Sequence, residues 1–189
     1  MKVTDFLREK VFGRGRAAQK ERIRTLKGLP KEKLKQEIGL LFHEMCVKHA
    51  ANFVKDELNK SYSPFKGVPK SKLFHEIMIL TYWLLDNTVS KNKKAAVFDE
   101  VYNKYFELFN VTFKREEELA SLLQRHRAYY NSWDEVTGHQ DEFGLKAAEF
   151  IFDKKRDIQR IDEVSFWIIS YAHSTMKAFS DMNKKLPVH

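Results

Sequence analysis

The stretch that decides the fold is Ile77-Met78-Ile79-Leu80-Thr81-Tyr82-Trp83-Leu84-Leu85, a run of nine nearly all apolar residues that Asp86 ends. Such a run is far shorter than the roughly 20 residues that a helix needs to cross a bilayer. A helix that is apolar around most of its circumference is typical of the centre of a helical protein. We therefore expect a central helix from about Ser71, as its N-cap, to Val89, and no transmembrane segment.

Helical periodicity extends on both sides of this segment. Gly28-Leu29-Pro30 precedes a predicted helix over 31–59, because proline suits the first turn of a helix. A loop is expected at 61–69, where two prolines and a glycine occur within nine residues. Further apolar patterns predict helices at about 95–109, 119–133, 141–155 and 157–183. In the second of these, five residues repeat at intervals of four and three and predict a seam buried in the core, namely Leu119, Leu123, His126, Tyr130 and Trp133.

Composition supports a purely helical fold. The chain of 189 residues has only seven glycines and four prolines, too few for the many turns of a β-sandwich or barrel. Its length suits one core. We predict an all-α bundle of about six main helices over residues 30–189, preceded by a basic amphipathic helical arm over residues 1–29.

Positive charge is concentrated at the start of the chain. Residues 1–35 hold twelve lysines and arginines against four acidic residues, whereas the remaining 154 residues hold 22 of each sign. The whole net charge of +8 therefore belongs to the first segment. An acidic partner would meet that segment first, although such charges also occur on solvated helix faces that pair with acids elsewhere in the protein.

Two parts of the arm suggest different contacts. Phe6 and Phe12 belong to an apolar stripe on a basic helix, a pattern of helices that lie on an anionic membrane surface or dock in a partner's groove. The later part is rich in cations that can neutralise phosphates or acidic side chains. We predict that the partner-binding residues are Phe6, Phe12, Arg14, Arg16, Lys20, Arg22 and Arg24.

The motifs of common enzyme classes are absent from the sequence. There is no Gly-x-Ser-x-Gly elbow, no Walker loop and no glycine-rich kinase loop. The single cysteine, Cys46, lies within an apolar helical pattern and is expected to be a buried thiol, which fits a reducing, cytoplasmic location. We assign no catalytic residue and no cofactor.

Histidines in a helical bundle raise an alternative, a metal site or an enzyme with an interior polar site. Helical metal sites usually take ligands three or four residues apart, and the helical histidines lack that spacing. One cavity would have to collect ligands from several helices. The candidates for such a site are Glu44, His49, Glu76, His126 and His173.

The aromatic residues near Arg125 and Arg127 allow one further hypothesis. Tyr130 and Trp133 continue the predicted seam, which leaves Tyr129 as a surface group that could stack on a nucleic-acid base. Core packing explains the segment better. From the sequence we thus expect a non-enzymatic binding or adaptor module that engages nucleic acid, an anionic membrane or an acidic protein through its arm, with a homo-oligomer through the first helix's apolar stripe as a further option.

Overall fold

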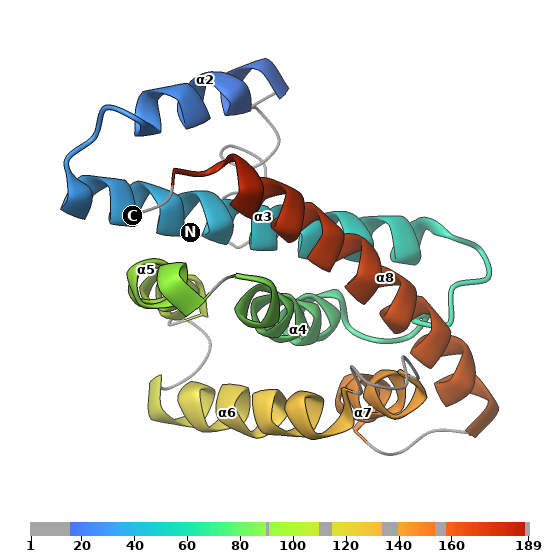
Figure 1. Ribbon diagram of the computed structural model, residues 1–189. Helices are drawn as coiled ribbons and strands as arrows, with labels where there is room; N and C mark the ends of the chain where they lie inside the picture. Colours follow the sequence, from blue (N-terminus) through green and yellow to red (C-terminus); the bar gives the residue numbers. More distant parts are fainter. Residues whose placement is uncertain (1–15, 90, 110–114, 134–139, 154–157, 188–189) are drawn as a thin grey trace.

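The computed structural model describes residues 16–89, 91–109, 115–133, 140–153 and 158–187. These residues form helices joined by turns and loops, without a strand (Figure 1). The predicted all-α bundle is therefore confirmed. The helices of the described chain are α2 (Arg16–Leu26), α3 (Lys31–Asn59), α4 (Lys70–Thr88), α5 (Lys91–Phe109), α6 (Arg115–Ser132), α7 (Asp141–Phe152) and α8 (Ile158–Lys185).

A proline stands immediately before each of the helices α3 and α4. Pro30 precedes α3, whose bounds agree with the predicted 31–59. Pro69 takes the N-cap position of α4, with φ −56° and ψ 133°, and its carbonyl accepts a hydrogen bond from Leu73 N at 2.9 Å. Ser71 therefore lies inside the first turn, and its predicted role as N-cap is wrong. The rigid proline ring already sets the backbone angle that a cap residue must adopt.

The central helix is α4. Every residue from Leu73 to Leu85 is buried, including the whole apolar run of the sequence. This helix packs against α3, α6, α7 and α8, while α5 lies across α3. Within this run, Thr81 Oγ1 donates a hydrogen bond to the Ile77 carbonyl at 2.5 Å and also hydrogen-bonds the Tyr171 hydroxyl of α8 at 2.6 Å. The burial predicted for this segment is confirmed.

Aromatic rings fill the space between α4, α6 and α7. The Trp83 ring lies 5.8 Å from Tyr129, 5.5 Å from Trp133 and 5.1 Å from Phe143, measured between ring centroids. At these separations aromatic rings attract one another beyond their area burial. Cys46 on α3 is fully buried, as predicted. Burial raises the pKa of its thiol, which disfavours the reactive thiolate.

The inner face of α6 differs from the predicted one. Leu119, Leu123 and Tyr130 are 42%, 57% and 73% exposed, whereas Leu122 and Tyr129 are buried. The predicted seam is therefore wrong for these residues, and so is a base-stacking role for Tyr129. The helix is turned so that polar side chains on the other face reach partners on α4 and α5, as described below.

Close packing between α7 and α8 depends on Gly144. A Cβ atom there would lie 2.1 Å from Ser165 Oγ, 2.9 Å from Ser165 O and 3.0 Å from Ser165 Cα. Rotation of the serine side chain relieves the first contact but not the two backbone contacts. The two helices can approach this closely only because residue 144 has no side chain.

We expect Gly144→Ala to lower the free energy of unfolding by about 1–3 kcal/mol, because α7 and α8 must separate. The sign is opposite to that of an ordinary helical position, where alanine is favoured over glycine by about 1 kcal/mol. Urea denaturation measures the change. The control is Gly28→Ala, whose added Cβ has its nearest neighbour at 4.0 Å. A Gly144→Ala protein as stable as the native one would contradict the packing.

Among the residues that the structure describes, no helix has both the length and the apolar content required to cross a membrane. Helix α4, which contains the long apolar run of the sequence, also carries polar side chains and is buried from Leu73 to Leu85. This agrees with the expectation from the sequence.

Candidate functional site

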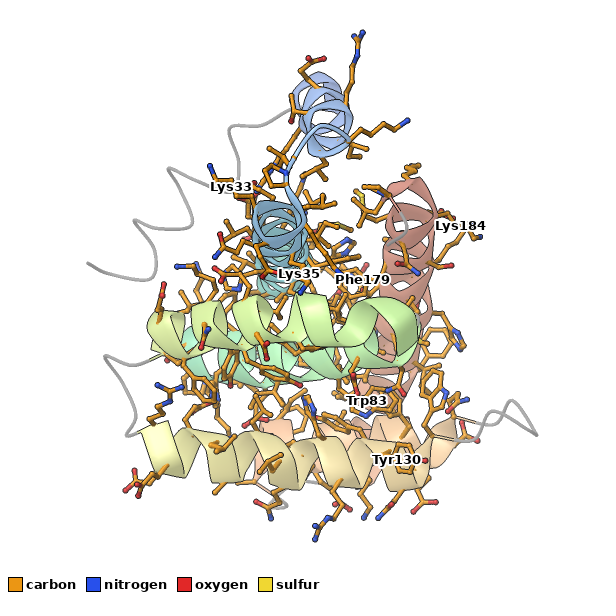
Figure 2. The ribbon with its side chains drawn as sticks, turned by 60° about the vertical axis from the view of Figure 1, so that its left-hand side comes forward. Lys33, Lys35, Trp83, Tyr130, Phe179 and Lys184 are labelled. Atoms are coloured by element: carbon orange, nitrogen blue, oxygen red, sulfur yellow. The ribbon has the colours of Figure 1, made fainter. Side chains whose placement is uncertain are left out.

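The turn between α2 and α3 carries a group of exposed cations. Arg24, Lys27, Lys31 and Lys33 are all exposed, and none of them forms an ion pair within the described part of the chain. We call these four residues the basic corner. They lie within a stretch of ten residues, 24–33, that includes Gly28-Leu29-Pro30. Figure 2 shows Lys33 near the beginning of α3, below α2.

Arg22 attaches α2 to α3. Its Nη1 donates to Glu44 Oε2 at 2.7 Å, and its Nη2 donates to Glu37 Oε2 at 3.0 Å. The Arg22 side chain is only 16% exposed. Leu26, one turn further along α2, is buried against the core. Arg22 is therefore engaged within the protein, whereas the four cations of the basic corner face solvent.

A groove of about 500 Å³ opens beside this corner. Its lining combines an apolar floor with polar and charged rims: Thr25, Leu26, Leu29, Lys33, Gln36 and Glu37. The lining residues come from the end of α2, the turn that follows it and the first turns of α3, so the groove lies between these two helices. A ligand seated here would contact Lys33 and the apolar floor together.

Of the predicted arm residues, Arg22 and Arg24 have described side chains. Arg24 is exposed, as a partner-binding residue must be. Arg16 and Lys20 lie on α2, but their side chains are outside the described residues, as are Phe6, Phe12 and Arg14 entirely. The predicted apolar stripe of the first helix also lies outside the described residues.

A second group of polar residues is buried between α4, α5 and α6. Glu118 on α6, 3% exposed, accepts hydrogen bonds at Oε1 from His75 Nε2 on α4, at 2.7 Å, and from the Tyr105 hydroxyl on α5. The same Tyr105 oxygen lies 3.4 Å from His75 Nε2. Together with the ion pair of Glu76 and Arg125, these residues form what we call the interior polar cluster.

Burial and hydrogen bonding together determine which groups of this cluster are ionised. Burial alone raises the pKa of Glu118, but hydrogen bonds from His75 and Tyr105 outweigh it and lower the pKa of Glu118 below its ordinary value. Burial and the neighbouring carboxylate raise the pKa of Tyr105 well above its ordinary value. The phenol therefore stays a proton donor and the carboxylate stays ionised at neutral pH. This arrangement ties three helices together.

The ion pair between Glu76 and Arg125 lies beside it. Arg125 Nε and Nη2 donate to the two carboxylate oxygens of Glu76, each at 2.6 Å, and Nη1 donates to Ser121 Oγ at 2.8 Å. The guanidinium carbon also lies 4.8 Å from the centroid of the Phe150 ring on α7. Burial opposes the charge of Arg125, yet the contact with Glu76 raises its pKa above the ordinary value.

The residues proposed for an interior metal site do not converge. Glu44 is bound to Arg22 and Glu76 to Arg125. His49 packs on the Phe179 ring and His173 on the Trp133 ring, with centroids 5.8 Å and 5.9 Å apart. Across the described residues, no three His, Cys, Asp or Glu side chains are placed to hold a metal ion. Glu44, His49, Glu76 and His173 thus each contact a different neighbour, and the structure does not bring the five candidates together as a metal site.

Sequence reasoning missed His75, Tyr105 and Glu118. A signal was present in two similar segments, Phe42-His43-Glu44 and Phe74-His75-Glu76. Both phenylalanines are buried, both glutamates bind an arginine of another helix, and both histidines hydrogen-bond a polar group inside the protein. His43 Nδ1 lies 2.5 Å from the Tyr82 hydroxyl. The shared pattern indicates buried polar contacts rather than a repeat of the fold.

Comparison of the chain with protein-family models, with curated proteins and with solved structures gives no match.

Proposed function

We propose that this chain is a binding module that engages an acidic macromolecule through its basic N-terminal segment. The observation that supports the proposal best is the basic corner, whose four cations are exposed and free of ion pairs within the described residues. Intramolecular pairing has neutralised Arg22 but has left its neighbours available to a partner. Arg14, Arg16 and Lys20 would extend the same positive segment toward the N-terminus.

Two acidic residues of α3 near this corner are paired with other cations. Glu37 is bound to Arg22, and Glu32 is hydrogen-bonded to Lys35 at 3.1 Å. The field of Arg24, Lys27, Lys31 and Lys33 is therefore directed into solvent, where it attracts polyanions and speeds their association. The groove beside Lys33 offers an apolar surface to the same partner.

A charge-reversal experiment tests the proposal. The triple variant Arg24→Glu, Lys27→Glu, Lys31→Glu should raise the dissociation constant for a polyanion by at least about tenfold. The control variant reverses three exposed lysines elsewhere, Lys55→Glu, Lys66→Glu, Lys177→Glu, and has the same net charge. Fluorescence anisotropy with a single-stranded oligonucleotide, sedimentation with phosphatidylserine vesicles and titration with polyglutamate measure the three partner classes separately.

Salt dependence identifies the kind of contact. For single-stranded nucleic acid, each neutralised phosphate contributes about −0.7 to the slope of log K against log salt, so the triple variant should lose about 2 units of slope. Lipid insertion by Phe6 and Phe12 would persist in part at high salt. If both triple variants weakened polyanion binding equally, the net charge of the protein alone would account for the binding. That result would contradict the basic corner as the binding surface.

A further inference from the structure

Three large apolar side chains of α6 face solvent in a row. Leu119, Leu123 and Tyr130 are 42%, 57% and 73% exposed and follow one another at intervals of four and seven residues. The row is about 16 Å long, from the rise of an α-helix. Figure 2 shows Tyr130 on α6 near its C-terminal end. We call these three residues the α6 seam.

The seam has no cover from the described part of the protein. α6 lies at the edge of the bundle, on the side away from α2 (Figure 1), and it packs against α4 and α7 through its other face. That face carries Glu118, Leu122 and Tyr129, all buried. A heptad-spaced row of leucines and an aromatic residue on an outer helix is the pattern by which helices pair with one another.

Opposite charges lie along the outer edge of the seam. At 100° per residue, Glu116 is roughly 20° and Arg127 roughly 40° from Leu123 around the helix. Both side chains are exposed, and neither forms an ion pair with any described residue. The acidic residue is in the first turn of α6, and the basic residue is in its second half. The edge is therefore complementary to a reversed copy of itself.

We propose that α6 pairs antiparallel with α6 of a second copy of this chain. Glu116 of each copy then lies next to Arg127 of the other, twice per interface, as a two-fold axis requires. A parallel pair would bring like charges together, which costs stability. The antiparallel arrangement also opposes the two helix dipoles favourably.

The small apolar area of the α6 seam limits the affinity of the dimer. Stable complexes bury about 800 Å² on each partner, whereas a single helix face of three apolar side chains offers much less. We therefore expect a weak, reversible dimer whose population rises with protein concentration. Because α2 lies on the opposite side of the bundle, both basic corners remain uncovered in the dimer (Figure 1).

Sedimentation equilibrium over a concentration series tests the apolar contact. Leu123→Glu should raise the dimer dissociation constant by at least about tenfold. Phe166→Glu on α8 is the control, since Phe166 is 69% exposed and lies outside the seam. Circular dichroism should show both variants folded, because each substitution is on the surface. A native chain that stays monomeric at every concentration, or a dimer that tolerates Leu123→Glu, overturns the proposal.

Charge exchange tests the antiparallel orientation. Glu116→Arg alone and Arg127→Glu alone should each weaken the dimer, because each places like charges opposite one another. The double variant Glu116→Arg, Arg127→Glu should restore native association, since the pairs are re-formed with their signs exchanged. Failure of the double variant to recover would overturn the antiparallel pairing.

Discussion

Arg125→Ala should lower the free energy of unfolding by about 3–5 kcal/mol, because it leaves the Glu76 carboxylate buried without its partner. Glu76 is 3% exposed and both of its oxygens are bound by the guanidinium at 2.6 Å. The substitution also removes the contact of the guanidinium with Phe150. Urea denaturation at neutral pH measures the change.

The control for this prediction is Arg127→Ala, two residues further along α6. Arg127 is exposed, so its removal should change stability by no more than about 0.5 kcal/mol. The double variant Glu76→Met, Arg125→Met should be more stable than Arg125→Ala, because replacing both partners by apolar groups leaves no buried charge. If Arg125→Ala and Arg127→Ala had equal effects, the ion pair would not be a determinant of stability.

Acidification should destabilise the protein between about pH 6.5 and pH 4, because two histidines, the buried His43 and the half-buried His126, are held in their neutral form by the fold. Burial lowers the pKa of His43 from its ordinary value of 6.5 to about 4, with a smaller contribution from Lys104. Burial likewise lowers the pKa of His126 to about 4, against the opposing effects of the Ile79 backbone and Asp86. His49 is shifted in the same direction.

The sign follows from proton binding in the two states. Below pH 6.5 the unfolded chain binds protons on these histidines and the folded chain does not, so the stability falls with falling pH until the folded-state pKa of about 4 is reached. Each histidine contributes up to about 3 kcal/mol over this window. Glu118 acts at lower pH, because its pKa lies below the ordinary value of 4.5.

Urea denaturation from pH 7 to pH 4.5 measures this loss. The variant His43→Asn, His126→Asn should have a flatter dependence of stability on pH in the window, although it is less stable than the native protein at pH 7. His173→Asn is the matched control, since His173 is exposed. A native protein with constant stability between pH 6.5 and pH 4.5 would show that neither histidine is held neutral.

The sequence alone was sufficient to predict the helices and the central position of α4. The apolar run from Ile77 to Leu85 can be satisfied only by burial on all sides, so its position follows from its own composition. The bounds of α3 follow from Pro30 and from the polar residues that end the pattern near Asn59. The excess of cations before residue 36 is likewise a property of the sequence, whatever the fold.

The inner face of α6 was decided by the tertiary structure. Leu119, Leu123 and Tyr130 repeat at heptad spacing, and so does a second set one residue out of step: Glu118, Leu122, Arg125, Tyr129 and Ser132. Hydrophobicity favours the first set for the core, but the structure turns the second set inward, with Arg125 half-buried and the other four residues buried. Glu118 and Arg125 are tolerated inside because His75, Tyr105 and Glu76 satisfy them.

The need for a partner on another helix also explains why the sequence alone did not determine the contacts of the candidate site residues. Whether Arg22 faces solvent or Glu44 depends on a helix 22 positions away, and whether Glu76 binds a metal or an arginine depends on one 49 positions away. A polar side chain is buried only when a partner from another helix compensates its loss of water. Apolar burial can be anticipated from one segment, whereas polar pairing is determined only when the segments meet.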